Sequence, residues 1–198
     1  MDILRQFTGK EMHQNNLKLL VNNIIEGTTV NGPGFRFGIW MQGCNRNCPG
    51  CFNKEACTPD GGYFISVDEI INKFSRQKYD GISVSGGEPF YQEEGLTVLL
   101  QQIKEAGADT LVFTGFTYDE LVRKNCKSLL YCDYLIDGPY IKDCPSHCKY
   151  TGSGNQRFLK LNEGIIQEDL TDKTEDITES EFIINQDGSI TTTGFLNI

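Results

Sequence analysis

The apolar residues of this chain gather into short segments that polar residues separate. These segments cover residues 17–25, 35–42, 81–85, 109–115 and 133–138. Most of them are continuous in apolar character instead of alternating, which is typical of strands buried on both faces of a parallel sheet. We therefore predict a strand in each segment.

Helical patterns separate the later strands. Ser66–Glu69 forms a capping box before the apolar-periodic run IINKF, residues 96–107 have helical periodicity, and Thr117–Glu120 is a second capping box. Strands and helices that alternate at this spacing predict a parallel sheet covered by helices. Since a full eight-unit barrel typically needs about 250 residues, the expected fold class is α/β with a partial, open parallel β/α barrel.

The last part of the chain has a different composition. Residues 163–198 contain nine Asp or Glu side chains against one basic residue, Lys173. Residues 166–179 (IQEDLTDKTEDITE) are mostly polar, and we predict a solvated linker there. Residues 181–185 and 189–195 flank Gln-Asp-Gly, which predicts a small C-terminal β-hairpin extension.

Composition and charge narrow the class of protein. A chain of 198 residues with 38% hydrophobic and 23% charged side chains is expected to form one globular domain. No segment approaches the roughly 18 consecutive apolar residues of a membrane span, and the N-terminus lacks the apolar core of a signal peptide, so we expect a cytoplasmic protein without a membrane partner. The net charge of -9 argues against nucleic acid as a partner.

Eight cysteines are many for this length and allow two explanations. They lie at positions 44, 48, 51, 57, 126, 132, 144 and 148. Exported proteins use such cysteines for disulfides, but this chain shows no export signal and gathers three cysteines within eight residues. A metal site in a reducing cytosol is therefore the better interpretation.

Cys44, Cys48 and Cys51 form the most informative motif. Their spacing lets three thiolates from one loop converge on an iron–sulfur cluster, and Pro49 and Gly50 turn the chain between them. Three protein ligands leave one iron of a [4Fe-4S] cluster open to a small molecule, whereas four are typical of an electron carrier. The motif therefore indicates a cluster that takes part in chemistry.

Two other interpretations of the motif stay open. A zinc ion held by Cys44, Cys48, Cys51 and Cys57 is the first, although structural zinc sites usually place roughly a dozen or more residues between two pairs of ligands. Buried thiols that bind no metal are the second, although a polar loop rich in Gly, Pro and Asn is an unusual place for them.

The spacing Cys44-x3-Cys48-x2-Cys51 resembles the signature of the radical S-adenosylmethionine (SAM) enzymes. Three further features resemble one branch of that superfamily, the anaerobic ribonucleoside-triphosphate reductase-activating proteins. They are the segment Asn31–Arg36 (NGPGFR), the CPGCFN form of the cysteine motif, and the segment Gly152–Arg157 (GSGNQR).

The resemblance extends from about Leu17 to Leu161. It divides the chain into an N-terminal extension at 1–16, a radical SAM core domain at 17–162, and an acidic linker with the C-terminal hairpin at 163–198. The two outer parts are not explained by the resemblance.

One position departs from the wider superfamily. Its members usually carry an aromatic residue just before the third cysteine, where this chain has Gly50, followed two positions later by Phe52. The activating proteins commonly share that glycine, so the departure favours the narrower branch.

The cysteines outside the motif have two interpretations. Cys144 and Cys148 flank His147 just before the GSGNQR segment, and together with Cys132 or Cys126 they offer ligands for a second metal. Reduced thiols that bind nothing are the simpler interpretation.

The resemblance implies that Gly86, Gly87 and Glu88 bind SAM. They follow a predicted strand, at the edge where parallel sheets place their ligands. The glycines allow a close backbone approach, and the Glu88 carboxylate can neutralise the ammonium group of SAM; an ordinary strand-to-helix turn is the alternative. The other candidate cofactor-binding residues are Phe52, Asn53, Ser85, Thr114, Asp137 and Arg157.

Several of these candidates have a structural alternative. Thr114 and Asp137 end two neighbouring predicted strands, and Asp137 either accepts hydrogen bonds from a ribose, positions the substrate backbone, or caps the following turn. Arg157 and Arg36 either bind a carboxylate of SAM or the incoming polypeptide, or form salt bridges inside the barrel.

The resemblance implies the activity of a glycyl-radical activase. A flavodoxin-like reductant supplies an electron to the cluster, SAM is cleaved, and the resulting radical removes a Cα hydrogen from a glycine of the anaerobic ribonucleotide reductase large subunit. No catalytic side chain is expected beyond the cluster and SAM. The alternatives are an activase of the pyruvate formate-lyase type, a peptide-modifying radical SAM enzyme, and a non-catalytic iron–sulfur electron-transfer module.

Overall fold

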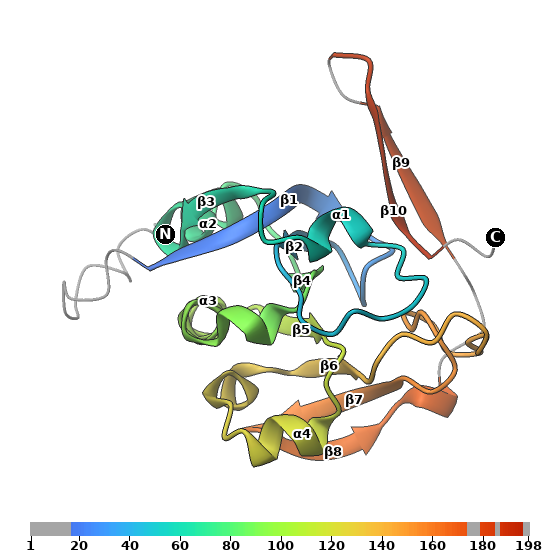
Figure 1. The fold of residues 1–198 in the computed structure, drawn as a ribbon. Coiled ribbons are helices and arrows are strands. Elements are labelled where there is room, and N and C mark those ends of the chain that lie inside the picture. The colour runs from blue at the N-terminus through green and yellow to red at the C-terminus, as the bar shows by residue number, and fades with distance from the viewer. Residues whose placement is uncertain (1–16, 174–178, 185–186, 196–198) are drawn as a thin grey trace.

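The computed structural model describes residues 17–173, 179–184 and 187–195, and an eight-stranded mixed sheet lies at its centre (Figure 1). Its strands, in the order in which neighbours are hydrogen-bonded, are β3 (Tyr63–Ser66), β1 (Lys18–Thr28), β2 (Arg36–Met41), β4 (Gly81–Gly86), β5 (Asp109–Phe113), β6 (Tyr134–Asp137), β7 (Arg157–Asn162) and β8 (Ile165–Asp169). The predicted mixture of helices with a parallel-rich sheet is confirmed.

The centre of the sheet is parallel and its two sides are antiparallel. Strands β2, β4, β5 and β6 pair in parallel and occur in this order along the chain, with β3 inserted between β2 and β4. Strands β1 and β3 extend the sheet antiparallel on one side, and β7 and β8 do so on the other. Within the described residues the sheet therefore ends at β3 and β8 and is not closed.

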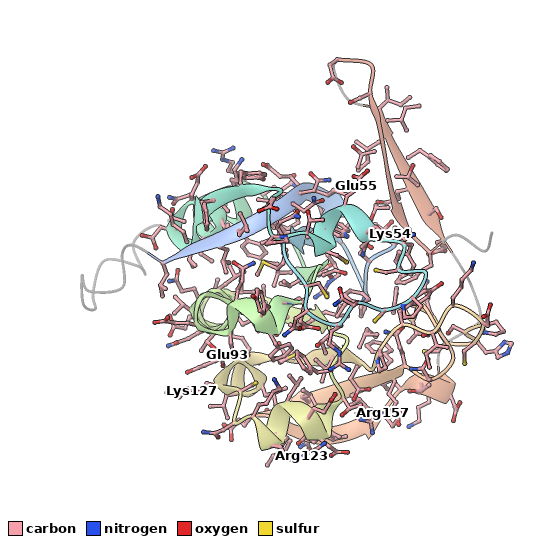
Figure 2. The ribbon with its side chains drawn as sticks, in the orientation of Figure 1. Lys54, Glu55, Glu93, Arg123, Lys127 and Arg157 are labelled. Carbon is pink, nitrogen blue, oxygen red and sulfur yellow. The ribbon has the colours of Figure 1, made fainter. Side chains whose placement is uncertain are left out.

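The crossover segments between the parallel strands carry the helices. These are α1 (Lys54–Cys57), α2 (Val67–Phe74), α3 (Glu93–Glu105) and α4 (Tyr118–Arg123), with 3-10 turns η2 (Pro89–Gln92) and η3 (Lys127–Tyr131); a further 3-10 turn, η4 (Thr171–Lys173), follows β8. The apolar residues of α2 and α3 pack into one core with the sheet. Figure 2 labels Glu93, which holds α3 to η3 because its Oε1 accepts the backbone N–H of Lys127 at 2.7 Å.

The predicted helix starts agree with the structure. Ser66 Oγ accepts the backbone N–H of Glu69 at 3.1 Å at the start of α2. Thr117 and Glu120 form both bonds of the capping box at the start of α4. Each side chain satisfies backbone donors that the first helical turn leaves without a partner.

The prediction of a solvated linker over 166–179 is wrong where it overlaps β8 and η4. Strand β8 pairs antiparallel with β7, and Lys160 stands opposite Glu168. A strand at the edge of a sheet is paired on one side only and is largely exposed to solvent, so it accepts charged side chains. A charged edge strand and a solvated linker therefore have the same composition in the sequence. Residues 174–178 of the predicted linker, and the extension at 1–16, lie outside the described residues.

The C-terminal hairpin is present. Strands β9 (Ser180–Ile184) and β10 (Ile190–Gly194) pair antiparallel, with Ile190 opposite Ile184 and Gly194 opposite Ser180. They form a separate two-stranded sheet that projects from the body of the molecule, drawn in red in Figure 1. No helix within the described ranges is long and apolar enough to cross a membrane.

Candidate functional site

A cavity of about 320 Å³ opens where the parallel strands end. Its walls come from the loops after β2, β4, β5 and β6, from the GSGNQR segment, and from the base of the C-terminal hairpin. This edge of a parallel sheet is the usual ligand-binding position in α/β folds, and a cavity of this size accommodates a small cofactor.

The loop after β2 brings the three predicted cluster cysteines to the cavity. Cys44, Cys48 and Cys51 all line it. The loop turns tightly because the Cys51 N–H bonds to the Cys48 carbonyl at 3.2 Å and Gly50 adopts φ +75°, a backbone conformation that favours glycine. Burial raises the pKa of Cys44, while a backbone hydrogen bond from Arg46 at 3.4 Å acts in the opposite direction.

A fourth thiol, Cys57 at the end of α1, also lines the cavity. Its Sγ lies 3.9 Å from the Sγ of Cys51 and contacts the carbonyl of Asn53 at 3.4 Å. Burial and the neighbouring Cys51 raise the pKa of Cys57 to about 12. Within the residues that the structure describes, no three His, Cys, Asp or Glu side chains are arranged to hold a single metal ion.

The Gly86-Gly87-Glu88 segment forms the wall beside the cysteine loop. A Cβ on Gly87 would lie 2.2 Å from the carbonyl oxygen of Gly43, and Gly86 has φ +100°. Both positions therefore require glycine. The Glu88 N–H donates to the Gly43 carbonyl at 2.9 Å, so backbone hydrogen bonds join this segment to the residue before Cys44.

Glu88 is fully buried and belongs to the wall of the cavity. Its carboxylate accepts hydrogen bonds from the Phe90 N–H at 3.1 Å, the Thr114 hydroxyl at 2.8 Å and the Gly115 N–H at 2.9 Å. Burial raises the pKa of Glu88, and these three donors oppose that shift. A carboxylate has about four acceptor positions, so one remains for a ligand.

The other predicted cofactor-binding residues divide into two groups. Phe52, Asn53, Ser85 and Thr114 line the cavity with the cysteines. Asn53 Nδ2 donates to the Gly86 carbonyl at 3.4 Å, which ties the end of the cysteine motif to the glycine segment.

Asp137 and Arg157 are not among the residues that line the cavity. They pair with each other, with Arg157 Nε 3.0 Å from Asp137 Oδ1, and Asp137 Oδ2 also accepts the N–H of Tyr118 at 2.7 Å at the start of α4. Figure 2 shows Arg157 near β7 and α4. For Arg157 the salt bridge inside the fold is the arrangement observed, whereas Asp137 holds Arg157 and the start of α4 and, among the described residues, accepts no hydrogen bond from the turn that follows it.

Arg36 is also engaged inside the fold. It is fully buried, lies 2.6 Å from Asp109 Oδ1, and donates to Ser83 Oγ at 2.7 Å and to the Pro33 carbonyl at 2.8 Å. Of its two interpretations, the salt bridge inside the sheet is the arrangement observed.

In the part of the chain that the structure describes, the cysteines outside the motif are not gathered with His147 into one group of ligands. Cys132 is buried and contacts the Tyr134 carbonyl at 2.9 Å, and burial raises its pKa. Cys144 lies in the loop before the GSGNQR segment, where its carbonyl accepts the N–H of Gly154 at 2.8 Å. Across the described residues, neither these cysteines nor His147 belong to a group of three potential metal ligands.

Sequence reasoning missed one charged residue of the cavity. Arg46 lies between two cysteines of the motif, stacks over the ring of Phe116 at 4.5 Å and lies 3.5 Å from Glu120. A cation between cluster cysteines is a signal that was available in the sequence. Gln156 was also missed, although its neighbour Arg157 was named; the Gln156 side chain lines the cavity and donates to the Gly138 carbonyl at 2.9 Å.

The hairpin residues of the cavity carried no signal at all. Thr192, Thr193, Gly194 and Phe195 line the cavity, although they lie about 140 residues after the cysteine motif. The Phe195 ring packs against Phe113 at 6.2 Å between centroids.

Comparisons with known proteins agree with this site. A family model described as a 4Fe-4S single cluster domain matches residues 30–159. The anaerobic ribonucleoside-triphosphate reductase-activating protein of Enterobacteria phage T4 is 30% identical over 147 residues, which are 71% of this chain and 93% of the relative. The protein of that name from Escherichia coli (strain K12) is 36% identical over 138 residues, 64% of this chain and 89% of the relative. A pyruvate formate-lyase-activating enzyme of Clostridium pasteurianum is 32% identical over 177 residues, 78% of this chain and 71% of the relative.

Proposed function

The chain belongs to the family of 4Fe-4S single cluster domains and to that of the anaerobic ribonucleoside-triphosphate reductase-activating proteins, and from this membership we propose that it installs a glycyl radical on an anaerobic ribonucleoside-triphosphate reductase. It is an enzyme of the radical SAM kind, with a [4Fe-4S] cluster and SAM as cofactors. One observation carries the proposal: a loop with three thiols and a glycine turn with a buried carboxylate face the same cavity and are joined by their backbones.

The donor set of the cavity fits the cluster. We assign Cys44, Cys48 and Cys51 as its ligands, because thiolates are the ligands that iron–sulfur clusters prefer and these three come from one tight loop. When bound and reduced, the cluster supplies the electron that cleaves SAM and starts radical chemistry. Cys57 lies outside the Cys44-x3-Cys48-x2-Cys51 spacing, and its Sγ contacts the Asn53 carbonyl at 3.4 Å, so we leave it out of the ligand set.

The glycine turn fits the amino-acid part of SAM. Gly86 and Gly87 present bare backbone beside the thiols, and the free acceptor position of Glu88 suits the ammonium group. Arg46 is the basic side chain among the described residues that line the cavity, and its fork suits a carboxylate. We propose that Glu88 and Arg46 hold the two charged ends of the methionine moiety.

The other cavity residues have positioning roles in this proposal. Asn53, Ser85 and Thr114 offer hydrogen bonds to the ribose and adenine, and Phe52 offers a ring face. Asp137 connects the start of α4 to Arg157 at the start of β7. In this proposal the two residues act on the site only by holding the neighbouring loops in place. Positioning matters because reacting atoms must meet at about 3–3.5 Å.

The target is a protein, and the open sheet suits such a target. A glycine Cα carries no side chain, so a loop that bears it can enter a narrow cavity. We propose that the sheet is the partial β/α barrel of the radical SAM fold and that its open side admits the polypeptide. The reductant in this proposal is a flavodoxin-like protein.

One experiment tests the activity in two steps. Anaerobic protein reconstituted with iron and sulfide is reduced with dithionite and mixed with SAM, and formation of 5'-deoxyadenosine is measured. The reductase is then added, and a glycyl radical is sought by electron paramagnetic resonance. Formation of 5'-deoxyadenosine is the expected result, and its absence would favour a non-catalytic electron-transfer module.

The second candidate is an activase of the pyruvate formate-lyase type. The relative from Clostridium pasteurianum favours it, because 78% of this chain aligns with that enzyme. The same resonance experiment with pyruvate formate-lyase as the added protein separates the two candidates. A radical on that protein and none on the reductase would replace the first proposal with the second.

A further inference from the structure

The C-terminal hairpin has two different faces, because directly opposed residues of two antiparallel strands point to the same side. One face holds the body of the protein. On it, Thr193 Oγ accepts a hydrogen bond from Asn31 Nδ2 at 2.8 Å, and Glu181 Oε1 accepts from the N–H and the hydroxyl of Thr29 at 2.9 and 2.6 Å. These contacts fix the base of the hairpin at the rim of the cavity.

The opposite face is apolar and exposed. It carries Phe182, Ile184 and Ile190, whose side chains are 67%, 77% and 64% exposed. The register places Ile184 opposite Ile190, and Phe182 opposite Thr192. A two-stranded hairpin is marginally stable by itself in water, so three exposed large apolar side chains on one of its faces indicate a surface that another polypeptide covers.

This apolar face continues into the wall of the cavity. Thr192 belongs to it by register, and Thr192 and Gly194 both line the cavity that holds the cysteines. A chain that lies on Phe182 and Thr192 is therefore led toward the cluster loop. The family model matches residues 30–159 only, so the hairpin is an addition to the part that carries the cluster.

The hairpin is acidic, and its negative charge favours some partner surfaces over others. Its described residues include Glu179, Glu181 and Asp187, and residues 174–198 contain no Lys or Arg. Lys149 pairs with Glu179 at 3.2 Å and Glu181 faces Thr29, which leaves the exposed Asp187, in the turn between the two strands, next to the apolar face. An apolar segment with a basic side chain near that turn complements such a surface.

We propose that the face formed by Phe182, Ile184, Ile190 and Thr192 docks an extended, apolar segment of the glycyl-radical enzyme, next to the glycine that enters the cavity. The inference rests on the proposed function. It assigns the hairpin to recognition of the protein substrate and leaves the reaction with SAM to the remainder of the cavity.

The test uses the full chain with paired substitutions. The test variant is Phe182→Ser with Ile184→Ser. The control variant is Phe64→Ser with Ile165→Ser, which removes the same side chains at 69% and 63% exposure from the outer strands β3 and β8. Neither pair contacts the thiols or Glu88, so 5'-deoxyadenosine formation from SAM without the reductase should be unchanged in both.

The measured quantities are the Kd of the reductase for each variant and the KM and kcat of glycyl-radical formation. We expect the test variant to raise Kd and KM about tenfold, with kcat nearly unchanged, and the control variant to leave both constants within about twofold. Unchanged Kd and KM in the test variant, or an equal rise in the control, would overturn the inference.

Two outcomes separate this inference from related failures. If the wild-type protein forms no 5'-deoxyadenosine, the proposed function fails, and the direct Kd measurement still decides whether the hairpin binds the reductase. If sedimentation shows that the test variant loses self-association while its Kd for the reductase is unchanged, the face is an interface between copies of this chain and the inference is wrong.

Discussion

The substitution Gly87→Ala tests whether the cysteine loop and the glycine turn form one unit. The new Cβ would lie 2.2 Å from the carbonyl oxygen of Gly43 and 2.7 Å from that of Ala56. Ordinary contacts begin near 3.4 Å, and both neighbours are backbone atoms, so the loop that precedes Cys44 must move by about 1 Å.

The expected loss follows from what that movement breaks. Overpacking of this kind costs about 1–3 kcal/mol. The same shift weakens the hydrogen bonds from the Glu88 N–H to the Gly43 carbonyl at 2.9 Å and from the Gly43 N–H to the Ala56 carbonyl at 2.8 Å, each worth about 0.5–1.5 kcal/mol. We expect the free energy of unfolding of the cluster-free protein to fall by about 2–6 kcal/mol.

Denaturation in urea and iron content after anaerobic reconstitution are the two measurements. The matched control is Gly115→Ala, in the same cavity, where the nearest atom to a Cβ is the flexible Arg46 Cγ at 3.1 Å. The control should lose less than about 1 kcal/mol and bind iron normally. If Gly87→Ala matches the wild type in both stability and iron content, the two segments are not coupled as described.

The remaining predictions concern single side chains. Cys48→Ala should abolish cluster assembly, whereas Cys57→Ala should keep the iron and SAM cleavage of the wild type; a cluster that is lost in the second variant would make Cys57 a ligand. Glu88→Gln should weaken SAM binding by about 1.5–3 kcal/mol with the cluster intact, measured by calorimetric titration, and an unchanged affinity would remove Glu88 from the site. Burial opposes ionisation of Glu181, but the hydrogen bonds from Thr29 outweigh it and lower the pKa of this carboxyl. The ionised Glu181 therefore helps to hold the hairpin on the body of the protein above the ordinary pKa of Glu. This contribution is lost as the pH falls through the lowered pKa. In limited proteolysis of the cluster-free wild-type protein, we expect faster cleavage near the hairpin at acid pH than at neutral pH. In Glu181→Gln, the rate of this cleavage should no longer depend on pH.

The strands of the eight-stranded sheet that the sequence predicts lie inside that sheet, where they are buried by neighbouring strands and by helices. β4 and β5 lie in the middle of the sheet, and their buried residues Ile82, Val84, Leu111 and Val112 give each segment a short apolar run that predicts a strand. β3 and β8 lie at the ends of the sheet in the described residues. The exposed positions of β8 include Gln167 and Asp169, so the pattern that marks a strand is lost there, whereas β3 is only four residues long and two of them, Tyr63 and Phe64, are exposed.

The residues of the site also differ in how well the sequence predicts them, because some come from one loop and others from separate elements. Cys44, Cys48 and Cys51 come from one loop, and their spacing is itself the chemical signal. Cys57 reaches the cavity only because α1 turns the chain back after the loop.

The GSGNQR segment shows a second limit of sequence reasoning. Adjacent side chains at the start of a strand point to opposite faces, and nothing in the sequence determines which of two neighbours faces the ligand. The structure turns Gln156 toward the cavity and pairs Arg157 with Asp137. The motif therefore identified the segment that reaches the cavity, but it did not identify which of its side chains lines the cavity.

The two walls of the cavity differ in how firmly they are held. The cysteine loop and the segment Gly86–Glu88 are joined by backbone hydrogen bonds through Gly43, so the chain by itself forms the wall that we propose for the cluster and SAM. The hairpin wall is held instead by contacts that involve side chains, among them those at Thr29, Asn31, Phe113 and Lys149. Such contacts open at a lower free energy than a sheet interior does. A permanent cofactor requires the first kind of wall, and a protein substrate that must enter and leave requires the second.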